Sequence, residues 1–129
     1  MPKSFRDLDV WNMSIDLTTA IYELTVDYPR QEIYGLSSQM RRAAVSVASN
    51  IAEGSSRGTY KDFRQFVKMA MGSNSELQTQ LVISRRLGFG EQRKCDKAEA
   101  LSQDVHRMLS GLSNYLAVKI RSKTPTNNQ

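Results

Sequence analysis

The stretch Tyr34–Gly54, YGLSSQMRRAAVSVASNIAEG, decides the fold of this 129-residue chain. When its residues are placed at about 100° per step, six apolar side chains share an arc of about 100°, as on the buried face of an α-helix. They are Leu36, Met40, Ala43, Ala44, Val47 and Ile51. Val45, Ala48 and Ala52 widen this apolar surface to about 200°. A helix that is apolar around more than half its girth is expected to have neighbours on two sides, which indicates a bundle and favours an oligomer.

Three further segments have helical periodicity, and a few breaker residues separate them. Pro29 ends the first helix, because the residue before a proline is pushed out of the α region. Gly54 is expected to end the second helix, and Thr59 to cap the start of the third. The helices are predicted over residues 7–28, 34–54, 59–87 and 91–121. Their short links predict an all-α, up-down-up-down antiparallel four-helix bundle at 7–121, with a loose lead-in at 1–6 and a disordered tail at 122–129.

The same periodicity predicts which side chains form the core. The first helix is expected to be broadly buried, on one stripe through Ile15 and Tyr22 and on another through Leu17 and Ile21. The third is expected to bury Phe63, Phe66, Val67, Ala70, Asn74, Leu77, Leu81 and Ser84. The fourth has a heptad seam of Ala98, Leu101, Val105, Met108, Leu112 and Tyr115. A chain of this length can bury one such core.

Charge is distributed unevenly along the chain. Residues 1–58 hold six Lys/Arg and seven Asp/Glu, whereas residues 59–129 hold twelve and six, within a net charge of +5. A basic half favours a polyanionic partner, although many basic surfaces only confer solubility. The single cysteine, Cys95, excludes an internal disulfide and fits a reducing compartment. No apolar run reaches the roughly 18–20 residues of a membrane span, so we expect a soluble, cytoplasmic protein without membrane contact.

Helical bundles can be enzymes, but the required residue patterns are absent from this sequence. A di-iron bundle needs Glu-x-x-His pairs, and the residue three positions before the single histidine, His106, is Gln103. One cysteine and one histidine do not form a zinc cluster, and no glycine-rich phosphate loop occurs. His106 is expected to be a surface or rim residue and not a catalyst. We therefore expect no enzyme, no catalytic residue, no metal and no cofactor.

Cations align on one side of the third helix. Lys61, Arg64 and Lys68 share an arc of about 60° with Arg86, and Arg57 in the preceding turn would extend it. This arc is either a solvated helix face or a surface that contacts phosphates. No aromatic residue interleaves with it, so contacts would be mainly to backbone phosphates, nonspecific in sequence and sensitive to salt.

Two further cations, Arg41 and Arg42, lie on the second helix. They are additional candidates for nucleic-acid contact. Alternatively, they form structural ion pairs with acids such as Glu53 or Glu76 of a neighbouring helix.

The outer side of the third helix carries unexpected small and apolar residues. A mid-helix glycine costs about 1 kcal/mol relative to alanine, yet Gly72 points away from the predicted core. This glycine is either an accidental weak spot or a place where the helix of another subunit packs. Together with the wide apolar girth of the second helix, it favours subunit packing through Val45, Ala48, Ala52, Met69, Gly72, Val82 and Ile83.

The chain also resembles a known family over about residues 5–88. The matching motifs are Asp7-Leu8-x-Val10-Trp11, Tyr34-Gly35-Leu36-x-x-Gln39-x-Arg41-Arg42-Ala43-Ala44-Val45-Ser46, Ser49-Asn50-Ile51-Ala52-Glu53-Gly54-x-x-Arg57 and Phe66-x-x-x-Ala70-x-Gly72-Ser73-x-x-Glu76-Leu77-x-x-Gln80-Leu81. They resemble the four-helix bundle proteins known as 23S ribosomal RNA intervening-sequence proteins. Val47-Ala48 departs from the Ile-Pro that is frequent in that family, which implies a straighter second helix.

The resemblance implies a bacterial four-helix bundle that assembles into a homopentameric ring or barrel, without recognised catalytic residues. It also implies distant kinship with accessory subunits of diversity-generating retroelements, which bind a reverse transcriptase and nucleic acid. We therefore expect a non-enzymatic homo-oligomeric scaffold that binds nucleic acid, RNA or DNA. The alternative is a protein-interaction module that serves as an accessory subunit for a nucleic-acid enzyme.

Overall fold

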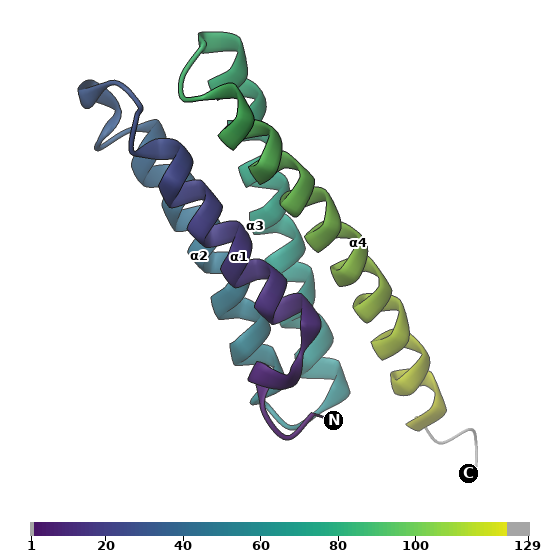
Figure 1. Cartoon of the computed structure of the whole chain (residues 1–129). Coiled ribbons are helices and arrows are strands. Elements are labelled where there is room, and N and C mark those ends of the chain that lie inside the picture. Colours follow the sequence, from purple (N-terminus) through teal and green to yellow (C-terminus); the bar gives the residue numbers. More distant parts are fainter. Residues whose placement is uncertain (1, 124–129) are drawn as a thin grey trace.

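The computed structural model describes residues 2–123, and all its regular elements are helical (Figure 1). The four long helices are α1 (Asp9–Thr25), α2 (Leu36–Ser55), α3 (Tyr60–Leu87) and α4 (Gln92–Lys123). Two short 3-10 turns, η1 (Phe5–Asp7) and η2 (Arg30–Glu32), precede α1 and α2. The predicted all-α four-helix bundle is confirmed.

Hydrogen bonds between helices show the direction of each neighbour. Thr18 Oγ1 donates to the carbonyl of Ala44 at 3.2 Å, and Arg41 Nε donates to Thr25 Oγ1 at 2.8 Å. Positions therefore descend on α2 as they rise on α1, so the two helices are antiparallel. The same relation holds for α2 and α3 through Met40–Ser84 and Ser46–Ser73, and for α3 and α4 through Arg64–Ser113 and Arg85–Asp96.

The cores of α2 and α3 follow the predicted stripes closely. On α3 all the predicted core residues are buried except Phe66, which is partly buried. The polar member, Asn74, is 1% exposed and forms reciprocal hydrogen bonds with Ser102 of α4 at 2.8 and 2.9 Å. A buried amide without partners would be costly, and this pair satisfies it while fixing the register of α3 against α4.

The first predicted helix differs from the observed one at its edges. α1 ends at Thr25, before the predicted residue 28, and its Ile15 and Tyr22 are 39% and 45% exposed, so only the stripe through Leu17 and Ile21 is fully buried. Residues 5–7 of the predicted loose lead-in form the turn η1. The ring of Phe5 packs edge-on against Trp11, with 5.0 Å between the ring centroids. The predicted tail begins too early, since residues 122 and 123 belong to α4, and residues 124–129 lie outside the described part.

Gly54 does not end α2, contrary to expectation, because the helix continues to Ser55. The residue is buried where α2 meets α3. A Cβ placed on it would lie 2.6 Å from Cβ of Phe66 and 3.2 Å from the carbonyl oxygen of Phe63. The glycine therefore allows the two backbones to approach closely. Thr59, by contrast, caps α3 as predicted, since its Oγ1 accepts from the amide of Asp62 at 3.1 Å.

The buried stripe of α4 also differs from the predicted seam. Leu109 and Leu116, which lie outside that seam, are at most 1% exposed, whereas its last member, Tyr115, is 53% exposed. The other seam residues lie in the core or pack against it, and the exposure of Tyr115 follows from the unequal length of the neighbouring helices. With 32 residues α4 extends beyond the start of the 17-residue α1, so the α1-facing side of its last turns has no helix to pack against.

We expect Gly54→Ala to destabilise the bundle by about 1–3 kcal/mol, because the added methyl group overpacks the α2–α3 contact. Thermal unfolding followed by circular dichroism would measure the change. The matched control is Gly111→Ala in α4, where an added Cβ meets no atom within 4 Å and a gain of about 0.5–1 kcal/mol is expected. Equal stability of the two variants would contradict the close approach at Gly54.

Candidate nucleic-acid interface

The structure brings three of the predicted cations together on one side of α3. Lys61, Arg64 and Lys68 stand at positions i, i+3 and i+7, which face the same way on a helix. Both lysines are exposed and Arg64 is partly buried. Among residues 2–123, none of the three forms an ion pair with a carboxylate. We call these three residues the α3 cationic face.

Other cations of the chain are neutralised by nearby acids. Arg85 donates to Asp96 at 2.8 Å and to both carboxylate oxygens of Glu99 at 2.8 and 3.3 Å. The hydrogen bonds to Glu99, followed by those to Asp96, raise the pKa of Arg85 above its ordinary value. The remaining pairs are Arg57–Glu53, Arg93–Glu91, Lys94–Asp27, Lys97–Glu23 and Arg107–Asp104. The α3 cationic face takes part in none of these pairs, so its positive charge is available to a ligand.

Arg64 also joins α3 to α4, because its Nε donates to the carbonyl of Ser113 at 3.0 Å. This bond places the first turns of α3 beside the last turns of α4. Arg121 is exposed there and lies eighteen residues, or five helical turns, after Gln103, which borders α3. Arg121 therefore adds a cation on the α3 side of α4. Sequence reasoning missed it because the pairing of the two helices was needed to locate it.

Arg57 does not extend the α3 cationic face, contrary to expectation. Its Nε pairs with Glu53 at 3.0 Å, and its guanidinium lies 4.8 Å from the ring centroid of Phe66. Phe66 packs toward α2 at Gly54, roughly 140–160° around α3 from Lys61 and Lys68. Its position and its carboxylate partner therefore separate Arg57 from the predicted stripe.

Arg41 and Arg42 have different surroundings. Arg41 Nε donates to Thr25 Oγ1 at 2.8 Å, and its guanidinium carbon lies 4.7 Å from the ring centroid of Tyr22. Its structural partners are therefore a hydroxyl and an aromatic ring, and not the acids of the alternative prediction. Arg42 is exposed and forms no hydrogen bond or ion pair within residues 2–123. Both line a surface hollow together with Tyr22 and Tyr34, two aromatic residues that were not predicted as site residues.

The residues predicted for subunit packing are spread over several surfaces. Met69 is 50% exposed near Gly72, at which an added Cβ would meet no atom within 4 Å. Ile83 is 43% exposed about 16 Å further along the same side of α3. Val82, which is 48% exposed, borders a groove between α3 and α4. On α2, Val45 is 42% exposed and Ala52 is partly buried. Ala48 is buried within the single chain, with only 7% of its surface exposed.

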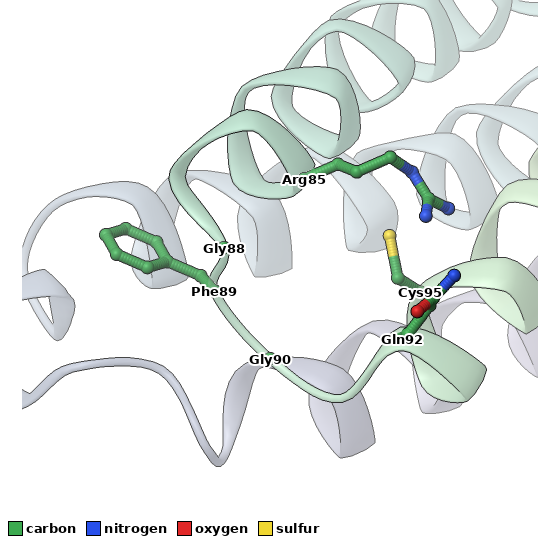
Figure 2. Close-up of a pocket in the computed structure, with 6 residues that line it drawn as sticks. All are labelled: Arg85, Gly88, Phe89, Gly90, Gln92 and Cys95. Carbon is green, nitrogen blue, oxygen red and sulfur yellow. The ribbon is translucent and has the colours of Figure 1, made fainter.

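A second hollow, of about 370 Å³, lies beside the turn between α3 and α4 (Figure 2). Arg85, Gly88, Phe89, Gly90, Gln92 and Cys95 line it. Figure 2 shows the Cys95 thiol directed toward the Arg85 side chain. Because Asp96 and Glu99 occupy that guanidinium, and burial keeps Cys95 in its neutral form, this hollow offers little free charge to a ligand.

The described residues contain no group of three or more His, Cys, Asp or Glu placed to hold a metal ion. His106 is exposed on α4, as predicted. Within residues 2–123, no helix combines the length and the apolar character needed to cross a membrane.

Comparison with known proteins places this geometry in a family. The family model described as 23S rRNA-intervening sequence protein matches residues 6–111. The chain belongs to this family. A crystal structure of a protein of unknown function from the S23 ribosomal protein family of Bacteroides thetaiotaomicron has the same fold, with a TM-score of 0.72 and 19% identity. The match covers 81% of this chain and 95% of that one. No curated protein matches this family member.

Burial should make the single thiol of this family member slow to react. Desolvation raises the pKa of Cys95 above 9.0, although the charge of Arg85 partly opposes the shift. Because the thiolate is the reactive form, we expect a chromogenic disulfide to label the native chain at pH 8 much more slowly than the chain in guanidinium chloride.

The same shift has a consequence for stability. The folded chain favours the neutral thiol of Cys95. Its contribution to the free energy of unfolding is therefore present below pH 9.0 and is lost as the pH rises further. Unfolding curves recorded as the pH rises above 9.0 should show that the free energy of unfolding falls more steeply in the parent than in Cys95→Ser. Equal labelling of native and unfolded chains would contradict the burial of Cys95.

Proposed function

We propose that the protein is a non-enzymatic, homo-oligomeric scaffold that binds nucleic acid, primarily structured RNA, through the α3 cationic face. Membership of the 23S rRNA-intervening sequence protein family supports a connection with RNA. We assign no catalytic residue, metal or cofactor to it. Its free, buried Cys95 fits a role in the reducing cytoplasm.

One observation carries this proposal: Lys61, Arg64 and Lys68 are aligned and lack carboxylate partners within residues 2–123, although six other cations have them. Lys61 and Lys68 are seven steps apart, which is about 10 Å along the helix axis. In duplex DNA, whose charge density serves as a guide, that length carries roughly six phosphate charges. A rigid helix that presents cations at this spacing can follow a nucleic-acid backbone.

The composition of the face favours a folded, double-helical ligand over a single strand. Single-strand binders place aromatic rings among their cations so that bases can stack. On the exposed side of α3 the cations are followed by Ser75 and Thr79, and Arg86 comes next on the same arc. Contacts would therefore be to phosphates, which gives weak sequence preference and strong dependence on salt.

Assembly of several copies would strengthen such weak contacts. A ring that repeats the same face links binding events on one RNA and raises the effective concentration of each. Half-exposed Met69 beside the bare backbone of Gly72 supports contact between subunits at this part of α3, and half-exposed Ile83, about 16 Å further along the same side, would extend that contact. The family resemblance implies that the number of subunits is five.

Lys61→Ala/Lys68→Ala should weaken binding to a perfect RNA duplex by at least tenfold at moderate salt. The slope of log affinity against log salt concentration should fall by about two, because two phosphate contacts are lost. Fluorescence anisotropy with a labelled duplex would measure both quantities. Arg64 is left intact because its bond to Ser113 also holds α4.

The matched control is Arg93→Ala/Lys97→Ala, which removes the same charge from residues that already pair with Glu91 and Glu23. We expect this control to bind almost as tightly as the parent. An absence of binding at low salt, or an equal loss in both double variants, would overturn the proposed interface.

We expect Gly72→Gln to reduce the size of the assembly, because a long side chain would separate helices that pack against the bare backbone. Within one chain the substitution has room and improves helix propensity. Sedimentation velocity would report the size, and circular dichroism would confirm that the bundle is folded. Gly111→Gln on α4 is the control.

An assembly of unchanged size would contradict packing at Gly72. That result would favour the second candidate function, a protein-interaction module whose exposed Met69, Val82 and Ile83 receive a partner protein, as in an accessory subunit of a nucleic-acid enzyme. A parent chain that sediments as a monomer would remove the homo-oligomeric part of the proposal.

A further inference from the structure

A separate surface lies where α1 ends and α2 begins. It contains a shallow hollow of about 340 Å³, within the usual size range of sites for small ligands. The hollow is lined by Tyr22, Ile33, Tyr34, Ser38, Arg41, Arg42 and Val45. The hydrogen bond between Met40 and Ser84 places this region beside Ser84 of α3, about 24 Å along the helix from Lys68. Substitutions in the two places can therefore be tested independently.

The charge of the hollow is positive. Two guanidinium groups, from Arg41 and Arg42, line it, and no carboxylate does. Arg41 is fixed in place because Thr25 accepts its Nε–H and Tyr22 lies beneath it. Its terminal N–H groups form no hydrogen bond within residues 2–123 and can donate to an anion. A fixed donor loses little entropy on binding, whereas the exposed Arg42 can adjust to the ligand.

The hollow also has an aromatic wall. Tyr34 is 96% exposed, so its ring is open to stacking. Tyr22 is 45% exposed, and one of its faces is covered by Arg41. Ile33 and Val45, which are 52% and 42% exposed, add apolar surface. A flat aromatic group attached to an anion would match both halves of this surface.

We propose that the hollow takes one unpaired nucleotide of a nucleic-acid strand, with its base stacked on Tyr34 and its phosphate bound by Arg41 and Arg42. This inference rests on the proposed function and adds a second subsite for the same class of ligand. The α3 cationic face lacks aromatic rings and holds a backbone, whereas this hollow receives an extruded base.

A nucleotide uses more of the surface than an acidic peptide would. A carboxylate satisfies the two arginines but leaves the open ring of Tyr34 without a partner. A base stacks on that ring irrespective of its identity, since every base has a flat aromatic face. The attached phosphate accepts the planar, forked donors of arginine in bidentate geometry.

The test uses the full chain and two RNA hairpins that differ only by one bulged 2-aminopurine, each closed by a polyethylene-glycol linker so that the perfect hairpin has no unpaired base. We expect the bulged hairpin to bind about tenfold tighter, in line with the contribution of one stacked base, and its fluorescence to change on binding. Tyr34→Ala should abolish both effects while affinity for the perfect hairpin is unchanged. Tyr34→Phe should retain them, and Arg42→Ala should reduce the preference. A matching pair of DNA hairpins shows whether the subsite accepts deoxyribonucleotides as well.

The outcomes separate this subsite from the proposed function. If the perfect hairpin binds through Lys61 and Lys68 but the bulge adds neither affinity nor a fluorescence change, the subsite is wrong and the proposed function stands. If no hairpin binds, 2-aminopurine riboside 5′-monophosphate is titrated alone. A saturable fluorescence change that Arg42→Ala removes supports the subsite, and no change overturns it. A change in the sedimentation of Tyr34→Ala also overturns it, because the hollow would then be an interface between copies or with an acidic partner segment.

Discussion

The close contact between α2 and α3 positions most of the surfaces described above. At Gly54 the helices approach so closely that a methyl group would collide with Phe66. Further along, Ser46 and Ser73 share a hydrogen bond of 2.9 Å. Small residues at both places let the backbones come together, and helices in such contact have little freedom to rotate. Because this contact turns Phe66 toward α2, Lys61 and Lys68 are turned outward.

Unequal helix lengths explain which apolar residues remain at the surface. α3 and α4 have 28 and 32 residues, whereas α1 and α2 have 17 and 20. The longer pair continues past the start of α1, which leaves Tyr115 and Val118 of α4 more than half exposed. Length explains only this overhang. It does not explain the exposure of Met69 next to Gly72, of Ile83 further along the same side of α3, or of Ile33 and Tyr34 before α2.

Sequence reasoning predicted the features that depend on neighbours along the chain. The four helices, the Thr59 cap and the buried stripes of α2 and α3 follow from local periodicity and capping. The partners of Arg41 and Arg64 could not be predicted, because each depends on how one helix is rotated and aligned against another. The same holds for the contact of Arg57 with Phe66, whereas its pair with Glu53 is local, at positions i and i+4. The hollow beside Tyr34 could not be predicted for the same reason, because Tyr22, which also lines it, belongs to a different helix. The α4 seam was wrong at its last member, Tyr115, because periodicity carries no information on the length of the neighbouring helix.

The distribution of ion pairs makes the bundle electrically uneven. α1 contains three acids and no lysine or arginine, and the Lys97–Glu23 and Lys94–Asp27 pairs place acidic side chains beside the first turns of α4. Such exposed pairs contribute only about 0–1 kcal/mol each to stability, but they cancel charge locally. The positive charge of the second half of the chain is thus concentrated where α3 begins and α4 ends. A long polyanion approaching the protein would be oriented by that field before any contact forms, since steering depends on uncancelled charge.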